Sequence, residues 1–290
     1  MDGAKRASAL ARSSNWGRVR PRHWRQNFAE LLGADKLTFM PMSDTLPDQL
    51  ANSRAYWGGW GHCWRSDGLE TFRSGVGHPL LNGVLRFDAD GSDALDEAVA
   101  LTRERLTGLP WAWWVGPDSR LGLGEDLRLR GAQLVETFPV MGLDVDDAAT
   151  AAPPEGLRIE EVADTDLQEW VGAWVGPFAI PTDEVPRLTG LEAARALPPQ
   201  DVVRLAGRVE GEIVATSMLA VAAGVAGMYV VATAAGHRGH GIGAAMTAAL
   251  VDAARERGVR TATLQATAAG ARVYRRLGFV PLGEYQLYVL

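Results

Sequence analysis

The sequence predicts a mixed α/β fold arranged as two domains in tandem. Its 290 residues are about twice the length of an average domain. Apolar residues make up 47% and charged residues 22%, which is ordinary globular composition and excludes disorder along most of the chain. Strand-like and helix-like segments alternate through the second half, and part of that series recurs in the first half. Alternation of this kind is typical of an α/β protein.

A linker between the two domains is predicted at residues 146–156, which read DDAATAAPPEG. The segment has no large apolar residue, and Pro153 and Pro154 block both helical and sheet hydrogen bonds. We therefore expect one domain at residues 26–145 and a second domain at residues 157–290.

Charge is divided unevenly along the chain, whose formal net charge is −6. Residues 1–25 hold seven basic side chains against one acidic side chain, and we expect them to form a flexible basic tail. The rest of the chain is acidic, which argues against a nucleic-acid-binding surface because phosphate binding needs clustered cations. An acidic body would instead steer a cationic ligand.

The single cysteine, Cys63, excludes an internal disulfide and a thiolate zinc cluster, so we expect a reducing, cytoplasmic location and no metal. No apolar segment follows the basic tail, which argues against a secretory signal. Residues 213–236 carry no charge and are long enough to span a bilayer. Two buried strands joined by a turn at Ala223 and Gly224 explain them better, because buried strands are continuously apolar.

The second domain is predicted to alternate strands and helices. Its strongest helix is expected at residues 241–257, where apolar residues recur with helical spacing and Gly258 ends the pattern. The other expected helices are 165–175, 182–197 and 268–277, and the expected strands are 157–162, 202–209, 213–221, 225–233, 261–266 and 281–290.

Part of this series recurs in the first domain. A predicted helix at 92–107 ends at Gly108, as the later helix ends at Gly258, and a strand at 111–115 corresponds to the strand at 261–266. A short helix then ends in DLRLRGA, as another ends in VYRRLGF, and the two pairs of matched glycines are 150 and 147 residues apart. We infer a duplicated fold.

A glycine-rich turn, TAAGHRGHGIGA at residues 233–244, lies between a buried strand and the strongest helix. Gly239, Gly241 and Gly243 let the main chain approach a ligand and point successive N–H groups into one concavity. The helix N-terminus adds its unpaired donors and about half a positive charge, and Arg238 adds a charged donor. The turn is therefore suited to a diphosphate.

Two other interpretations of this turn stay open. It could bind nothing, although four glycines in eight residues are costly without a use. It could also bind a dinucleotide, since Gly239, Gly241 and Ala244 satisfy G-x-G-x-x-G/A. Against a dinucleotide, the strand at 261–266 has no acidic residue, and only 46 residues follow the motif.

Residues 238–243, RGHGIG, resemble the R/Q-x-x-G-x-G/A motif of the GNAT superfamily of N-acetyltransferases. A second motif follows in that family's order: LQAT at 264–267, then Gly270, then VYRRLGF at 273–279, which ends in Y-x-x-x-G-F. The resemblance covers residues 157–290. It implies two tandem GNAT-like domains, each with a mixed, mostly antiparallel sheet flanked by helices, of which the second has the intact motif.

The resemblance implies that acetyl-CoA binds along a V-shaped opening between the strands at 225–233 and 261–266. In such enzymes the pantetheine arm pairs with the main chain like an added strand, and the diphosphate lies on the amides of the glycine turn. The cofactor-binding residues that the resemblance implies are Val231, Ala232, Thr233, Arg238, Gly239, His240, Gly241, Ile242, Gly243, Ala244, Thr267 and Tyr274.

The implied reaction is direct attack of an amine on the thioester carbonyl. Tyr274 matches the tyrosine that protonates the departing thiolate in many such enzymes. A thiol with a pKa near ~8.5 is a tolerable leaving group, so loss of this acid should slow the reaction without abolishing it. The amide of Val231 is the expected donor to the carbonyl oxygen.

The sequence identifies no general base. The glutamate that family members often carry on the strand before the glycine turn is absent from residues 227–232, GMYVVA. Water, or a carboxylate such as Asp183 or Glu184, remains a candidate. Tyr229 and His237 are the local titratable groups, and we expect His237 and His240 to be solvated.

The first domain is expected to lack a cofactor site. Ahead of its matching helix, residues 87–98 read FDADGSDALDEA, with one glycine, no arginine and five carboxylates, which would repel a diphosphate. Leu127 stands where the second domain has Tyr274. We expect one CoA site per chain.

Together these patterns predict an acetyl-CoA-dependent N-acetyltransferase that acts on a primary amine of a small molecule or peptide. We expect a monomer or homodimer that binds neither nucleic acid nor membrane. Because the base is missing, a non-catalytic acyl-CoA-binding or scaffold protein is the alternative.

Overall fold

The computed structural model describes residues 44–290 except 67 and 196, and the predicted basic tail lies outside the described residues. The strands are β1 (His62–Ser66), β2 (Leu69–Arg73), β3 (Asn82–Phe87), β4 (Ala112–Val115), β5 (Gln133–Asp144), β6 (Arg158–Glu161), β7 (Val202–Val209), β8 (Glu212–Ala222), β9 (Val225–Thr233), β10 (Thr261–Gln265) and β11 (Val280–Val289). The helices are α3 (Leu46–Gly58), α4 (Ser92–Arg105), α5 (Leu123–Leu129), α6 (Leu167–Val175), α7 (Val185–Ala193), α8 (Ile242–Glu256) and α9 (Gly270–Arg276).

These strands form one continuous sheet in the order β1-β2-β3-β4-β11-β5-β10-β9-β8-β7-β6. Two neighbouring pairs are parallel, β3 with β4 and β9 with β10. The other neighbours are antiparallel. The predicted mixed, mostly antiparallel sheet flanked by helices is confirmed.

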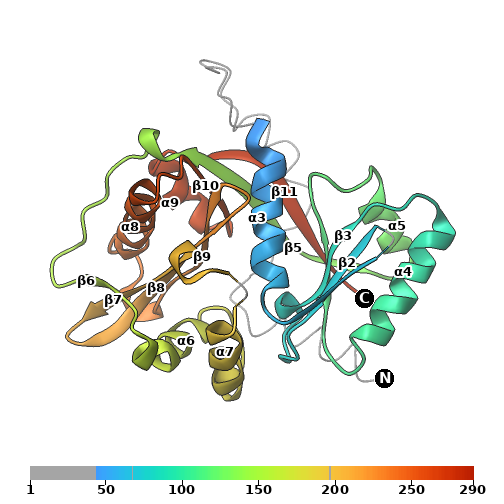
Figure 1. The fold of residues 1–290 in the computed structure, drawn as a ribbon, viewed down its shortest axis with the longest axis horizontal. Coiled ribbons are helices and arrows are strands. Elements are labelled where there is room, and N and C mark those ends of the chain that lie inside the picture. The colour runs from blue at the N-terminus through green and yellow to red at the C-terminus, as the bar shows by residue number, and fades with distance from the viewer. Residues whose placement is uncertain (1–43, 67, 196) are drawn as a thin grey trace.

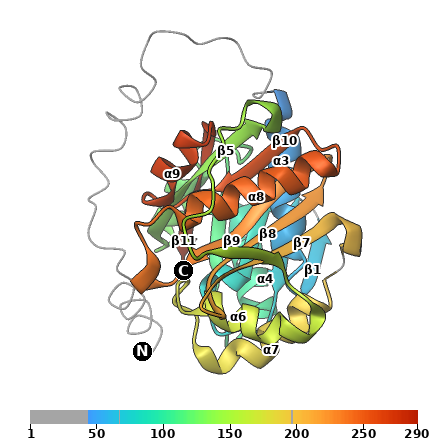
Figure 2. The ribbon, with the colours of Figure 1, turned by 90° about the vertical axis from the view of Figure 1, so that its left-hand side faces the viewer.

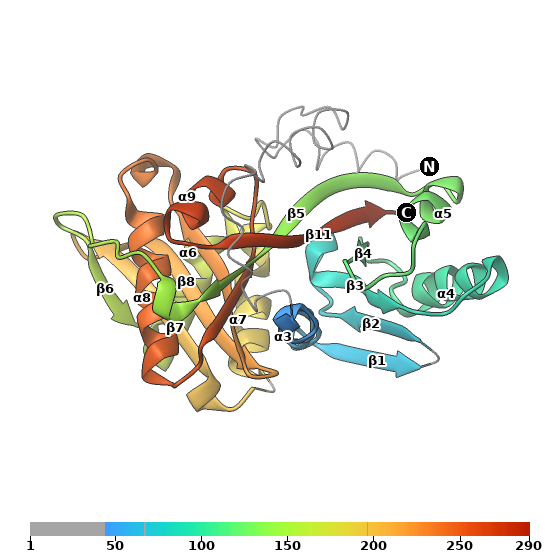
Figure 3. The ribbon, with the colours of Figure 1, turned by 90° about the horizontal axis from the view of Figure 1, so that it is seen from above.

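The two halves of the described chain exchange their last strands (Figure 3). β5 ends the first half but pairs with β10 of the second half, and β11 ends the second half but pairs with β4 of the first half. β5 and β11 run antiparallel to each other from Val280–Gly142 to Val289–Gln133. Each half therefore completes its part of the sheet with a strand from the other, and the predicted domain limits on either side of residues 146–156 stay a prediction.

The same order of elements occurs in both halves, as the matched glycines predict. In each half, a parallel strand pair is connected by a long helix, and a short helix and a long final strand follow. The first half has β3, α4, β4, α5 and β5 in this order, and the second half has β9, α8, β10, α9 and β11.

Helices cover both faces of the second half of the sheet. Along β8, Met218 packs in a cluster with Trp170 and Trp174 of α6, whereas Leu219 packs with Met246 and Leu250 of α8. Side chains of a strand alternate between the two faces, so α6 and α8 lie on opposite faces. Figure 2 shows α8 lying across the strands.

Helix α3 stands between the two halves (Figure 1) and contacts β8 and β9 of the second half as well as β2 and β3 of the first. Its Asn52 side chain is buried and donates hydrogen bonds to the carbonyls of Ala220, Ala222 and Val225, at 2.8–3.2 Å. These bonds tie the turn between β8 and β9 to the first half. The sequence analysis did not predict this helix.

The expected helices and strands of the second half are confirmed with small changes at their ends. Residues 213–236 form β8 and β9, and the turn at Ala223 and Gly224 has positive φ at both residues. Within the described residues, no helix has the length and apolar character needed to cross a bilayer. The helix expected at 182–197 is shorter: α7 begins at Val185, because Pro186 lacks an amide hydrogen and fits only the first turn, and it ends at Ala193.

Candidate active site

The parallel strands β9 and β10 separate part of the way along their length. They pair only from Thr261–Val225 to Thr263–Gly227, after which β10 stays paired with β5 and β9 stays paired with β8. The edge of β9 that faces β10 is therefore unpaired beyond Gly227, and the two strands enclose an opening.

Glycine is required where the strands part. A Cβ atom at Gly227 would collide with Oδ1 of Asn52 and with the ring of Tyr229. The Tyr229 hydroxyl donates to that Oδ1 at 2.5 Å, and its ring stacks on Tyr56 of α3 with centroids 3.5 Å apart. Helix α3 thus reaches the base of the opening.

A bulge in β9 directs main-chain amides into the opening. The pairing with β8 shifts register between Thr216 and Met218, and Val230 has a φ of 43°, which L side chains rarely adopt. Beyond the bulge, the amide of Ala234 donates to the Val214 carbonyl of β8. Because amides alternate sides along a strand, those of Val231 and Thr233 point away from β8, into the opening.

The glycine turn leads from β9 into α8. Gly239 and Gly241 have φ of 85° and 81°, and open space surrounds the position of a Cβ atom at each. Among the described residues, no protein acceptor takes a hydrogen bond from the amides of residues 239–243. Arg238 is exposed, and its Nε donates to the Thr233 carbonyl at 3.0 Å. The turn therefore presents free donors and a guanidinium at a helix N-terminus, an arrangement suited to an anion.

The predicted residues Tyr274 and Thr267 lie on the opposite side of the opening. Thr267 Oγ1 accepts a hydrogen bond from the amide of Gly270 at 3.1 Å, at the start of α9. Tyr274 is buried with its ring edge against Phe279. Burial raises the pKa of Tyr274 to about 12, so this hydroxyl holds its proton at neutral pH.

A cavity of about 180 Å³ connects Tyr274 and Val231 with the interface between the two halves. None of the described residues that line it is Asp, Glu, His, Lys or Arg. Half of the lining residues are aromatic, and most of those aromatic residues were not predicted as site residues. It is lined by Tyr56, Trp57, Trp60, Leu80, Leu81, Trp114, Phe138, Trp174, Phe178, Ile180, Met228, Tyr229, Val230, Val231, Gln265, Thr267, Gly270 and Tyr274.

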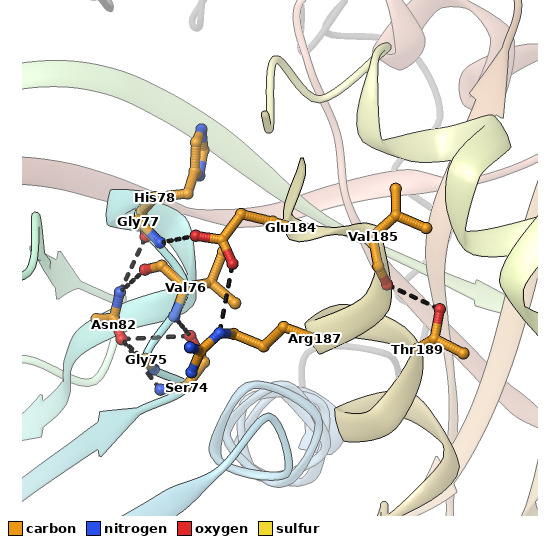
Figure 4. A network of polar contacts seen from close by, with 10 residues as sticks. All are labelled: Ser74, Gly75, Val76, Gly77, His78, Asn82, Glu184, Val185, Arg187 and Thr189. Atoms are coloured by element: carbon orange, nitrogen blue, oxygen red, sulfur yellow. Dashed lines mark hydrogen bonds and ion pairs between the residues drawn. The ribbon is translucent and has the colours of Figure 1, made fainter. Parts of the chain in front are cut away.

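Three of the candidate bases, Asp183, Glu184 and His237, do not line this cavity. Glu184 accepts a hydrogen bond from the amide of Gly77 at 2.9 Å and forms an ion pair with Arg187 at 3.5 Å (Figure 4). Asp183 is exposed, and His237 lies at the glycine turn. Tyr229 does line the cavity, but burial raises its pKa well above the ordinary value. Within the described residues, no group of His, Cys, Asp and Glu forms a metal site.

In the first half, an arginine lies at the corresponding helix start and pairs there with protein groups. Nη2 of Arg130 donates to the Ser92 carbonyl and hydroxyl at 3.1 and 2.8 Å, at the first residue of α4. Its Nε pairs with Asp96 at 2.5 Å. Leu127, the counterpart of Tyr274, is fully buried in the core.

Comparisons with known proteins agree with this geometry. Residues 167–279 match the family model described as the acetyltransferase (GNAT) family. No curated protein sequence matches the chain.

Solved structures share the fold at low sequence identity. A GCN5-related N-acetyltransferase from Kribbella flavida has a TM-score of 0.65 and 22% identity, over 83% of this chain and 95% of that chain. A conserved protein of unknown function from Staphylococcus epidermidis has a TM-score of 0.60 and 13% identity, over 79% and 94%. A tandem GNAT protein from the clavulanic acid biosynthesis pathway has a TM-score of 0.54 and 14% identity, over 77% and 78%.

Proposed function

We propose that the chain is an acetyl-CoA-dependent N-acetyltransferase, from the premise that residues 167–279 match the acetyltransferase (GNAT) family model. Its acceptor is a primary amine of a small molecule or a peptide. The observation that carries the proposal is the row of amides at residues 239–243, whose hydrogens have no protein acceptor among the described residues. Free amides at a helix N-terminus favour a bound diphosphate.

The residues around the opening fit the shape and charge of acetyl-CoA. Val231 and Thr233 offer amides, and Ala232 lies between them on the unpaired edge of β9, where an extended pantetheine arm could pair. The amides of residues 239–244 and the guanidinium of Arg238 suit the diphosphate, with His240 beside them on the same turn. Thr267 uses its oxygen to accept from Gly270, so its hydroxyl hydrogen stays available to the cofactor.

Acetyl-CoA supplies the acetyl group as a thioester. In the proposed reaction the amine lone pair forms the new C–N bond and the C–S bond breaks. The sulfur takes the proton of the Tyr274 hydroxyl, and the product nitrogen releases one proton, which restores Tyr274. Because burial raises the pKa of Tyr274 to about 12, its hydroxyl carries the proton at the start of each turnover. The amide of Val231 would stabilise the carbonyl oxygen as it gains charge.

Calorimetric titration with CoA tests the proposed site. We expect one site per chain, and Gly241→Asp should abolish it by placing a carboxylate among the amides. Gly122→Asp is a matched control, since Gly122 precedes α5 with φ 84° and ψ −5°, close to the φ 81° and ψ −4° of Gly241. The control should bind CoA normally. If the unaltered protein gives no heat with CoA, the proposed function is wrong.

The alternative, a non-catalytic acyl-CoA-binding or scaffold protein, is favoured by one observation. The cavity is lined by no Asp, Glu, His, Lys or Arg side chain from residues 44–290, of which 67 and 196 are not described. Release of free thiol from acetyl-CoA in the presence of a panel of amines separates the two functions. If CoA binds but no amine releases thiol, the binding function holds.

A further inference from the structure

The first half of the chain contributes an aromatic wall to the cavity that Tyr274 also lines. We define this wall as Tyr56 and Trp57 of α3, Trp60 of the turn that follows α3, Trp114 of β4 and Phe138 of β5. The Trp57 and Trp114 rings lie 5.0 Å apart, and Trp114 stacks on Phe138 at 5.8 Å. Trp174 and Phe178 of the second half face the same cavity. Such a surface fits a flat apolar group.

The aromatic wall is held in place by a buried ion pair that lies behind it. The Arg195 guanidinium stacks on Tyr56 at 4.4 Å and on Trp60 at 4.0 Å, and it donates to the Tyr56 carbonyl. Glu192, fully buried, pairs with Arg195 at 2.6 Å and with Arg204 at 2.8 Å. Because the carboxylate is already paired with two guanidinium groups, it offers no free charge to a ligand.

The cavity itself carries no charge at neutral pH. Among the described residues that line it, the ionisable side chains are all tyrosines; burial raises the pKa of Tyr56 and Tyr274 to about 12 and holds that of Tyr229 well above its ordinary value. An ammonium ion that enters would lose its hydration without meeting a counter-ion, which is costly. Burial of an amine in such surroundings favours its uncharged form.

On the basis of the proposed acetyl transfer, we propose that the acceptor is a small primary amine with an apolar, ring-sized body, and that the cavity binds it as the uncharged free base. The ring lies against the aromatic wall, and the nitrogen points toward Tyr274 and Val231. This differs from the cationic ligand that the acidic body indicates, because surface charge acts on approach and the cavity wall acts on the bound molecule.

Binding of the free base also accounts for the missing general base. The amine that attacks has already lost its extra proton to solvent before it enters, so no carboxylate or imidazole is needed beside it. The only proton that leaves during the reaction is the one from the product nitrogen, which Tyr274 recovers as described above.

The test measures dissociation constants of amines from the protein saturated with CoA, at pH 7. The probes are 2-phenylethylamine, its less basic analogue 2,2-difluoro-2-phenylethylamine, and the diamine putrescine. We expect the difluoro analogue to bind more tightly, by about tenfold for each unit by which its pKa is lower. Putrescine should bind at least about a hundredfold more weakly than 2-phenylethylamine.

Two variants connect this preference to the aromatic wall. Trp57→Ala should weaken 2-phenylethylamine at least about tenfold and leave CoA binding unchanged. Trp64→Ala is the control, because Trp64 lies on β1 against His62 and does not line the cavity. Should Trp57→Ala fail to fold, as judged by CoA binding, Phe178→Ala serves the same purpose from the second half.

Each failure has its own signature. If putrescine binds as tightly as 2-phenylethylamine, if amine pKa has no effect on affinity, or if the cavity variants bind 2-phenylethylamine normally, the inference about the acceptor is wrong and acetyl transfer can still stand. If CoA does not bind, the proposed function itself is wrong.

Discussion

The starts of α8 and α4 are the most informative pair of regions in the molecule. Both follow a strand of a parallel pair, and both are preceded by a glycine with positive φ, Gly241 and Gly91. Within the described part of the chain, no protein acceptor is bound to the first amides of either helix, and at α8 the exposed Arg238 precedes them. At α4 the guanidinium of Arg130 binds Ser92 and Asp96, and the nearby side chains are acidic.

The difference shows that the order of elements does not by itself make an anion site. A helix start binds an anion when its amides are free and the local charge is positive. At α4 the acidic side chains favour the helix N-terminus itself, and the arginine is used for internal pairing. The start of α8 is therefore suited to an anion, whereas the start of α4 is not.

The largest expected effect comes from placing the same carboxylate at both helix starts. Gly241→Asp should weaken CoA binding by about a thousandfold, or ~4 kcal/mol, leaving no measurable site. Gly91→Asp should leave one full site per chain. Calorimetric stoichiometry measures both, and a site that survives in Gly241→Asp would mean that the first half binds CoA.

The next effect concerns the junction between the halves. Asn52→Ala removes three hydrogen bonds to carbonyls and one from Tyr229, so it should lower the free energy of unfolding by about 3 kcal/mol. Urea denaturation measures the change. Gln49→Ala, one turn earlier on α3, removes a single bond to Thr45 and should cost about 1 kcal/mol. Equal costs for the two variants would refute a special role for Asn52.

A comparison of two buried tyrosines tests the acid. Tyr274→Phe should lower kcat about thirtyfold with little change in CoA affinity, because only the proton donor is lost. Tyr288→Phe is the control, since its hydroxyl bonds to Gln286 in the core of the first half. Steady-state assays of thiol release give both values. Unchanged kcat in Tyr274→Phe would remove this residue from the mechanism.

The smallest effect is a pH dependence that belongs to the first half alone. Burial lowers the pKa of His78 from 6.5 to about 4. The neutral ring accepts a hydrogen bond from Leu80. Because the pKa of His78 is lower in the folded protein than in the unfolded chain, the folded state is fully favoured above pH 6.5. This contribution to the free energy of unfolding is lost as the pH falls from 6.5 toward 4. We expect unfolding free energy to drop by about 1 kcal/mol from pH 7 to 5.5. His78→Gln should flatten this slope, and an unchanged slope would assign it to other groups.

The sequence predicted the second half well because its signals are local. The glycine turn, the helix that follows it and the hairpin turns each depend on residues a few positions apart. The aromatic wall was not predicted, because the sequence does not distinguish a tryptophan that packs in the core from one that lines a cavity, as Trp57 and Trp114 do. These two residues meet only through long-range packing, so no local pattern identifies their contact.

The exchange of the final strands could not be predicted either. Both β5 and β11 are ordinary apolar segments, and long-range pairing determines which strands they lie beside. The consequence of the exchange concerns biosynthesis. Residues 280–289 fill a place in the interior of the sheet, between β4 and β5. Until the ribosome has made these residues, that place is empty and the edges of β4 and β5 that pair with β11 are unpaired. The first half is therefore synthesised early but completed late, and a nascent chain would expose those edges to chaperones until β11 arrives.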